Sequence, residues 1–505
     1  MRRRHLLFAL GISSFFAGRV KTAVMKGASA GLASSRASAA SLTAQPGMET
    51  STARAHAFSI FWSAVRRVDP ENLVSDAIQV GSREGGAEGS RAVQIAGERF
   101  DLEGDGGVRM LAFGKASLRM AKGAESKLGD FGGGGVLKKG IVIAQNSEEA
   151  ERLANEGTLS SYIFTGALGN MPDSDSAAAA AKGMELAREG TDKDLLLVLI
   201  SGGGSALFPL PAPGITLEEK IATIKALVKT GASINELNTV RKHLSACKGG
   251  QLGAASRSPV VALVLSDVIG DRLETIASGP TVPDSSTFAD ALDVLKRADP
   301  SDIPPSVMAR IQDGVAGMIP ETPKKLDSGG ASRTHIVGSN GIACEAAIQK
   351  AVELGYDAHV HTLGLSGDVS DAVDAVCAMI REGDAAGRKP SCIILAGETT
   401  VQGAGSVSGI GGRCTHMALC VANKMQGVGG WVLLSGGTDG QDGPTDAAGA
   451  VADGETAERG RGVGVDGEKF VADFDSYTFF EREGGILRTG LTGTNVMDIH
   501  VLLRF

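Results

Sequence analysis

The segment 201–205, Ser-Gly-Gly-Gly-Ser, is the part of the sequence best suited to binding an anion. Its three glycines carry no Cβ, so backbone N–H groups can approach an anion closely, and glycine adopts positive φ at little cost. The segment matches neither the GxxxxGK[ST] pattern of P-loops nor GxGxxG. It therefore predicts either a tight turn or a phosphate or carboxylate cradle formed by Ser201, Gly202, Gly203, Gly204 and Ser205.

Two basic residues and two pairs of carboxylates occupy similar positions, after an apolar run or at the end of a glycine-rich loop. They are Lys115, Arg413, Asp267, Asp271, Asp439 and Asp442. Phosphoryl transfer uses such groups, because cations neutralise the moving phosphoryl and carboxylates hold Mg²⁺ or accept a hydroxyl proton. Any one of them is more readily explained as a turn residue, but together they favour a ligand cleft.

Apolar segments typical of buried strands precede most of these side chains and would position them. Residues 195–200 form a run of six apolar residues, which suits a strand buried on both faces, and 108–113 and 260–265 are similar. Helical patterns lie between these runs, so we predict a doubly wound α/β domain. In such sheets, ligands bind beyond the carboxyl ends of the strands.

The chain divides into a leader and two domains. Residues 321–332 are polar, with Pro and Gly, and are the best linker candidate. We therefore predict an N-terminal α/β domain at 48–320 and a C-terminal α/β domain at 333–505. Residues 1–47 hold seven Lys or Arg and no acid, which is typical of a transit peptide. Mitochondrion is favoured over plastid and secretion, and a cytoplasmic location is a further alternative.

Charge and composition limit the classes of molecule that this protein is expected to bind. Beyond residue 47 the chain has 43 basic and 58 acidic residues, which does not favour nucleic acid or an anionic membrane. No apolar run approaches the length of a membrane span. The six cysteines form no CxxC pair and are expected to be reduced thiols.

Several long segments resemble one known family. They are LISGGGSALFPLPAP, GASINELNTVRKHLSACKGGQL, LSDVIGDRLETIASGPTVPD and LSGGTDGQDGPTDAAGA, and the ending TGLTGTNVMDIHVLL also fits. In type and order these motifs look like those of the class II glycerate kinases, the glycerate 2-kinase family with a C-terminal MOFRL domain. The resemblance runs from about residue 55 to the C-terminus.

The resemblance implies ATP- and Mg²⁺-dependent phosphorylation of D-glycerate to 2-phosphoglycerate. It also implies a Rossmann-like N-terminal domain, a smaller C-terminal α/β domain with its MOFRL region at about 390–500, and an active site in the cleft between them. D-glycerate and ATP would be the partners, without nucleic acid or membrane, and a homodimer is left open.

The resemblance also suggests roles for individual residues. Lys115, Arg413 and Asp267 would be catalytic, and Asp267 and Asp271 would be candidate metal ligands. Together with the strand-end pattern, it places contacts to substrate or ATP on Ser201, Gly202, Gly203, Gly204, Ser205, Asn238, Arg241, Asp439 and Asp442.

The sequence departs from the family pattern at two places. After Arg413 the family usually has Asn-Gln-Glu, whereas this chain has Cys414-Thr415-His416, so a carboxylate that supports Mg²⁺ or a helix contact is lost. Residues 170–173, Asn-Met-Pro-Asp, replace a His-Pro turn that many members have before Pro-Asp. Two alternatives stay open: a hydroxypyruvate reductase, which the absence of GxGxxG disfavours, and a glycerate- or nucleotide-binding protein without turnover.

Overall fold

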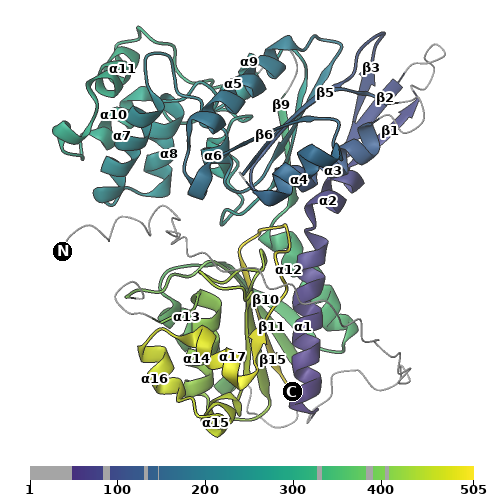
Figure 1. The fold of residues 1–505 in the computed structure, drawn as a ribbon, viewed down its shortest axis with the longest axis vertical. Coiled ribbons are helices and arrows are strands. Elements are labelled where there is room, and N and C mark those ends of the chain that lie inside the picture. Colours follow the sequence, from purple (N-terminus) through teal and green to yellow (C-terminus); the bar gives the residue numbers. More distant parts are fainter. Residues whose placement is uncertain are drawn as a thin grey trace.

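A computed structural model of the chain describes residues 48–82, 91–129, 135–145, 147–326, 332–382, 390–403 and 409–505. These residues form two α/β halves, one above the other in Figure 1. The predicted targeting segment at 1–47 lies outside the described residues. Within the described ranges, no helix combines the length and the apolar character needed to cross a bilayer.

The N-terminal half is built on six parallel strands in the order β6-β5-β4-β7-β8-β9. They are β4 (Val108–Phe113), β5 (Leu137–Gln145), β6 (Tyr162–Gly166), β7 (Leu195–Ile200), β8 (Val260–Leu265) and β9 (Ser332–Gly338). Every residue of β7 and β8 is buried, as their continuous apolar runs predict. The chain winds from β4 outward to β6 and then returns to β7 on the other side of β4. The switch point of the sheet therefore lies between β4 and β7, and the prediction of a parallel α/β sheet is confirmed.

Helices cover both faces of this sheet. Met110 and Ala112 of β4 belong to the core that includes α3 (Ser117–Leu128), whereas Leu111 and Phe113 belong to the core that includes α5 (Ser174–Glu189). Alternate residues of one strand thus feed opposite cores. The remaining elements of this region are α2 (Pro70–Ala77), α4 (Glu148–Glu156), α6 (Gly204–Leu207), α9 (Gln251–Ala255) and a small antiparallel sheet of β1 (Ile78–Ser82), β2 (Arg91–Ile95) and β3 (Glu98–Leu102).

Four helices form a separate bundle beside the sheet (Figure 1). They are α7 (Leu217–Lys229), α8 (Ile234–His243), α10 (Phe288–Leu295) and α11 (Pro305–Val315). Their buried side chains make a core of their own. Capping boxes fix the first turns of three of these helices, at Thr216, Ser233 and Thr287, each with an acidic side chain three residues later. The bundle therefore has well-defined helix starts, and its first two helices face the carboxyl end of β7.

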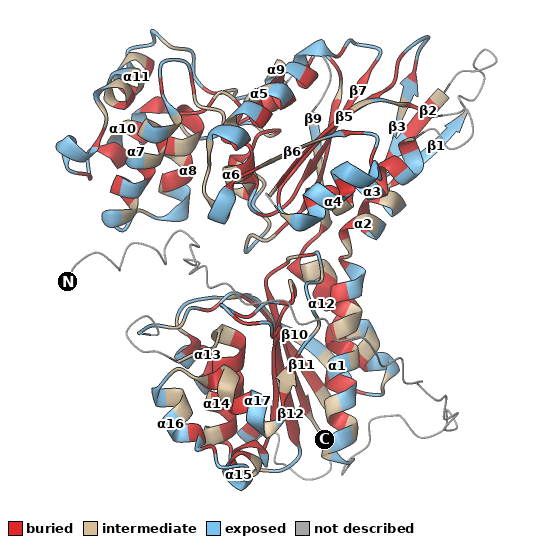
Figure 2. Ribbon diagram, viewed as in Figure 1, coloured by how far each residue is buried: buried red, intermediate tan, exposed pale blue. Residues whose placement is uncertain are grey.

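The C-terminal half has a mixed sheet in the order β10-β11-β15-β12-β13-β14. The strands are β10 (Asp357–Leu365), β11 (Ser391–Gly397), β12 (Trp431–Gly437), β13 (Gly449–Asp453), β14 (Ile486–Leu487) and β15 (Asp498–Arg504). The last strand of the chain inserts between β11 and β12 and is antiparallel to both. Figure 2 shows these strands buried between the helices on either side. The helices are α1 (Thr50–Arg67), α12 (Asn340–Glu353), α13 (Val369–Glu382), α14 (Arg413–Lys424), α15 (Thr456–Gly462), α16 (Gly467–Ala472) and α17 (Ser476–Glu483).

The predicted domain boundaries were wrong in two places. Helix α1, assigned to the 48–320 domain, packs against α12, β12 and β15 of the C-terminal half. Strand β9, assigned to the 333–505 domain, pairs with β8 and extends the N-terminal sheet. The chain therefore crosses between the halves just after α1 and again just after β9, not at 321–332. The buried residues of α1 recur at helical spacing, but such a local pattern does not specify which sheet covers them.

This packing predicts that residues 1–47 are dispensable for folding. A chain that begins at Met48 keeps the whole of α1, and keeps the contact of Met48 with the Tyr356 hydroxyl. We expect it to have the Tm and circular dichroism spectrum of the full chain.

A chain that begins at Asp69 is the matched control. It loses Ile60, Phe61 and Val65, which are buried under the C-terminal sheet, and burying each such side chain contributes roughly 1.5–3 kcal/mol. That sum is comparable to the net stability of a domain, so the shorter chain should not fold. Loss of cooperative unfolding in the chain that begins at Met48 would show that residues 1–47 are needed for folding.

Candidate active site

The loops after β4 and β7 are joined by main-chain hydrogen bonds. The Lys115 N–H donates to the Gly202 carbonyl oxygen at 2.8 Å, and the Ser201 N–H donates to the Phe113 carbonyl oxygen at 3.2 Å. The buried Ser201 hydroxyl accepts from the Ala116 N–H at 3.0 Å, at the start of α3. Ser201 therefore holds the two loops together and is not among the residues that line the cavity.

Glycine is required at positions 202 and 203 by their neighbours. A Cβ on Gly202 would lie 2.1 Å from Oδ2 of Asp267, and one on Gly203, whose φ is +77°, would lie 3.2 Å from Cγ of Lys115. The glycine loop, the lysine and the carboxylate thus meet at the switch point. Burial raises the pKa of Asp267, and the Lys115 ammonium works in the opposite direction. The structure brings together these four residues, which the sequence had placed at three separate strand ends.

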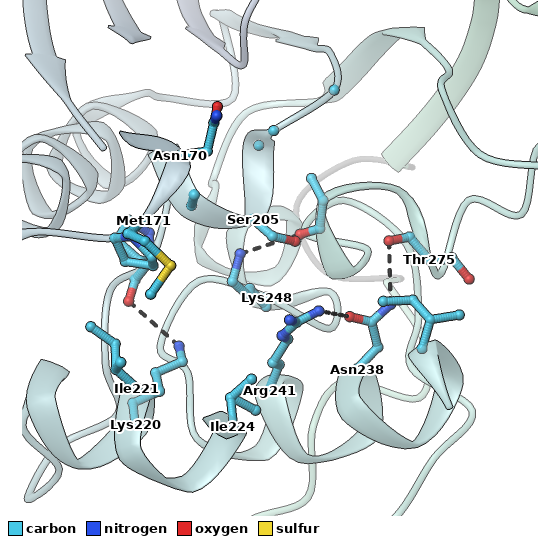
Figure 3. Close-up of a pocket in the computed structure, with 18 of the residues that line it drawn as sticks. Asn170, Met171, Ser205, Lys220, Ile221, Ile224, Asn238, Arg241, Lys248 and Thr275 are labelled. Atoms are coloured by element: carbon cyan, nitrogen blue, oxygen red, sulfur yellow. Dashed lines mark hydrogen bonds between the residues drawn. The ribbon is translucent and has the colours of Figure 1, made fainter. Parts of the chain in front are cut away.

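A cavity of about 320 Å³ opens between the glycine loop and the helices α7 and α8. Gly202, Gly203, Gly204 and Ser205 line one side, and Asn238 and Arg241 of α8 line another. A chain of hydrogen bonds lies beside the cavity, and Figure 3 shows its link between Arg241 and Asn238. The Ser205 hydroxyl lies 3.0 Å from that of Ser278, Ser278 donates to Oδ1 of Asn238 at 3.2 Å, and Nη1 of Arg241 donates to the same oxygen at 3.1 Å.

Two lysines of the cavity were missed as site residues. Lys220 of α7 is 6% exposed and Lys248, in the loop after α8, is 2% exposed. Burial, and then the charge of Lys248, lowers the pKa of Lys220 to about 7. Burial likewise lowers the pKa of Lys248 to about 8. The signal for Lys220 was present, because it lies on the same helix face as the buried Thr223, Ile224 and Leu227.

The C-terminal half presents a cluster of carboxylates around Arg413. Nε and Nη2 of Arg413 bind the two oxygens of the fully buried Asp498, at 2.5 and 2.9 Å, and Nη1 lies 2.8 Å from Glu398. The guanidinium is therefore held by its own half of the molecule. The catalytic role that the family resemblance suggests for Arg413 stays a prediction.

Carboxylates of the two halves influence one another. Desolvation raises the pKa of Glu398, and among the further contributions are the nearby Asp498, Asp267 and Asp439. Desolvation also raises the pKa of Asp439, and Lys115 of the other half lowers it. Asp267 and Lys115 therefore face Glu398 and Asp439 across the space between the halves.

Asp442 has a structural role that the sequence did not reveal. Its Oδ1 accepts from the Cys414 N–H at 2.9 Å and its Oδ2 accepts from the Thr415 N–H at 2.8 Å, so it caps the start of α14. Burial raises the pKa of this carboxyl group to about 6, against the effect of the two amides. The structure assigns Asp442 to this helix and not to a ligand.

The predicted metal pair is only partly assembled. Asp271 lies in a turn with φ of +52° and is not among the residues that line the cavity. In the described part of the chain, no three His, Cys, Asp or Glu side chains come close enough to hold a metal ion. Asp267 is thus the member of the pair that lies at the site.

The family departure at 414–416 lies inside the C-terminal half. His416 is buried, and its ring stacks on Phe474 with 5.1 Å between the ring centroids. Burial lowers the pKa of His416. A glutamate there would lose this stacking, so His416→Glu should lower the Tm measured by thermal unfolding.

Two family profiles match the sequence. Residues 56–312 match a domain of unknown function, DUF4147, and residues 391–498 match the MOFRL family. The second match falls at the predicted MOFRL region of about 390–500.

Curated proteins and a solved structure are similar over most of the chain. The sequence is 38% identical to the D-glycerate 2-kinase of Thermotoga maritima, in an alignment that covers 85% of this chain and 98% of that protein. It is 37% identical to the glycerate kinase of Danio rerio, with 90% and 98% covered. A crystal structure of a glycerate kinase from Thermotoga maritima matches with a TM-score of 0.74 and 35% identity, over 90% of this chain and 100% of that one.

The lowered pKa values of Lys220 and Lys248 predict pH-dependent anion binding. Sulfate keeps its charge above pH 6, so only the protein titrates, and both lysines lose their protons as pH rises past about 7 and 8. We therefore expect the sulfate affinity of the cavity to fall between pH 6.5 and pH 9, as measured by isothermal titration calorimetry.

The double variant Lys220→Met, Lys248→Met is the control for this measurement. It should bind sulfate weakly at every pH in the range. A wild-type affinity that stays constant from pH 6.5 to 9 would contradict the assignment of these lysines to anion binding.

Proposed function

Because the chain belongs to the glycerate 2-kinase family, with a DUF4147 domain followed by a MOFRL domain, we propose that it transfers the γ-phosphoryl group of ATP to the 2-hydroxyl of D-glycerate. The products are 2-phosphoglycerate and ADP. The main support is the similarity to a curated D-glycerate 2-kinase and a curated glycerate kinase. The two alignments span 85–90% of this chain at 37–38% identity, and each spans 98% of the relative.

The geometry at the switch point supports phosphoryl transfer in the cleft between the halves. The exposed ammonium of Lys115 lies beside the glycine loop, where it can neutralise charge on the phosphoryl in transit. Asp267, in the loop after β8, lies against the glycine loop at Gly202, so it can orient the attacking hydroxyl, and its raised pKa suits it to accept the proton. Such positioning and charge stabilisation account for most of the catalysis in kinases.

Mg²⁺ is part of the same proposal. In kinases this ion is held by one or two carboxylates plus the phosphates, so a site with three protein ligands is not required. Asp267 fits that role, since its Oδ2 lies against Gly202 in the loop proposed to bind phosphate, and Glu398 is near enough for the Asp267 charge to affect its pKa. Bound Mg²⁺ would supply neutralisation of the phosphate charge, and these two carboxylates would hold it.

The experiment that tests the function is ADP release from purified protein with ATP and D-glycerate, and ³¹P NMR of the product. A 2-phosphoglycerate signal is expected, and a 3-phosphoglycerate signal would overturn the choice of hydroxyl. NADH oxidation with hydroxypyruvate tests the reductase alternative. ATP binding without ADP release would favour the binding-protein alternative.

Lys115→Ala should lower kcat by about 10²–10³ with a small change in KM for glycerate, because the lysine acts mainly in the transition state. The side chain is exposed, so folding should be unaffected. Steady-state kinetics measures both constants.

The control is Lys122→Ala, on the helix α3 that follows Lys115, whose ammonium forms an exposed ion pair with Glu71. It should leave both constants unchanged. A well-folded Lys115→Ala enzyme with near-normal kcat would return Lys115 to the role of an ordinary solvated lysine.

We also infer that residues 1–47 direct the protein to mitochondria, on the basis of their acid-free, Arg-rich composition. A fluorescent protein carrying these residues should accumulate in mitochondria. Accumulation in plastids, secretion or a diffuse cytoplasmic signal would each overturn the assignment.

A further inference from the structure

We propose that the adenine nucleotide occupies the cavity of the N-terminal half, with its phosphates on Lys220, Arg241 and Lys248 and its base against the apolar side of α7 and α8. This inference rests on the proposed kinase function, because it assigns one of the two kinase substrates to this cavity. It assigns Lys220 and Lys248 a role in binding the nucleotide. It also places the nucleotide and glycerate at different positions, with glycerate entering from the space between the halves.

The first support is an excess of unpaired positive charge. Lys220, Arg241 and Lys248 come from three segments and point toward the same space (Figure 3). None of them forms an ion pair with a carboxylate of the described residues. Each lysine makes one hydrogen bond to a main-chain carbonyl oxygen, Lys220 to Pro209 at 3.4 Å and Lys248 to Ala277 at 3.3 Å. An ammonium has three donors, so most of this capacity is unused.

The amount of charge favours a polyphosphate. Burying three like charges together is unfavourable unless an anion compensates them. Glycerate has a single negative charge, which cannot neutralise three cations. The triphosphate of ATP carries several charges along an extended chain and can contact all three.

The second support is the apolar wall opposite the cations. Leu217, Ile221 and Ile224 of α7 and Ile234 of α8 line the cavity together with Met171. Glycerate has no ring or methyl group to cover this surface, whereas a purine does. A pocket with an apolar wall and a few convergent polar groups is typical of cofactor sites.

The third support is the extent of the cavity. Besides the isoleucines and the three cations, its lining includes Gly202, Gly203 and Asp267. Lys115 lies against Gly203. A nucleotide with its base on the isoleucines would therefore present its terminal phosphate to Lys115 and Asp267, where the C-terminal carboxylates come near.

The test uses Lys220→Met and Lys248→Met in the full chain, because methionine keeps the unbranched shape and removes the charge. Binding of AMP-PNP without glycerate is measured by isothermal titration calorimetry. We expect each variant to weaken binding about tenfold or more, as for a lost charge-assisted contact, while KM for glycerate changes little. The ligand-free Tm should stay the same or rise, because an unpaired buried charge is removed.

Lys229→Met is the matched control. Lys229 lies on the same helix, and its ammonium pairs with Asp302 at the surface. This variant should bind AMP-PNP like the wild type. If the pocket lysine variants bind AMP-PNP normally, or if they raise KM for glycerate without affecting AMP-PNP, the inference is overturned and the cavity is not the nucleotide site.

Ile221→Ser separates the base from the phosphates. It should weaken AMP-PNP binding but leave tripolyphosphate binding unchanged, and equal effects on both ligands would overturn the placement of the base. The function and the inference fail separately. A wild type that binds AMP-PNP through these lysines but phosphorylates no glycerate refutes the function alone, whereas active enzyme with unaffected lysine variants refutes the inference alone.

Discussion

The close contact between the loops after β4 and β7 is the constraint on which the site depends. A Cβ on Gly114 would lie 2.2 Å from Oγ of Ser201, so no larger residue fits where these loops touch. The Ser201 hydroxyl then binds the Ala116 amide and sets the start of α3. This contact places Lys115 on the glycine loop at the switch point, where α/β sheets bind ligands. The tight turn that the sequence offered as one interpretation is thus present, and the ligand cradle remains a proposal.

Two buried lysines on neighbouring helices differ in whether a carboxylate pairs with them. Lys242 of α8 is paired at 3.0 Å with Asp284, whose carboxylate also accepts from Thr322. Lys220 of α7 has no carboxylate partner among the described residues and lines the cavity. Ala277, which also lines the cavity, and the adjacent Ser278 adopt positive φ of 50° and 61°. Backbone strain of this kind costs about 1–3 kcal/mol per residue and is concentrated at functional sites.

Local sequence patterns predicted the strands of the N-terminal sheet and the loops that carry Lys115, Gly202 and Asp267, because apolar runs and glycines act through nearby residues. They could not assign α1 or β9 to a sheet, since that depends on partners distant in the chain. Asp442 is a second example of a role that depends on distant residues. The Asp and Gly residues around it predict a loop, but they do not tell whether the carboxylate binds a ligand or caps α14. The insertion of β15 between β11 and β12 is also a non-local choice that no short pattern reveals.

The distribution of charge over the two halves restricts how they can approach one another. The N-terminal half presents unpaired cations, whereas the C-terminal half presents Glu398, Asp439 and the Asp498 that already holds Arg413. Triphosphate bound on the cations would meet carboxylates whose charged forms are already disfavoured, first by desolvation and then by neighbouring carboxylates. Bringing the halves together over a bare nucleotide would add like charges in a desolvated space. If the nucleotide binds as proposed, a cation that accompanies its phosphates would offset this repulsion between the phosphates and the carboxylates of the C-terminal half.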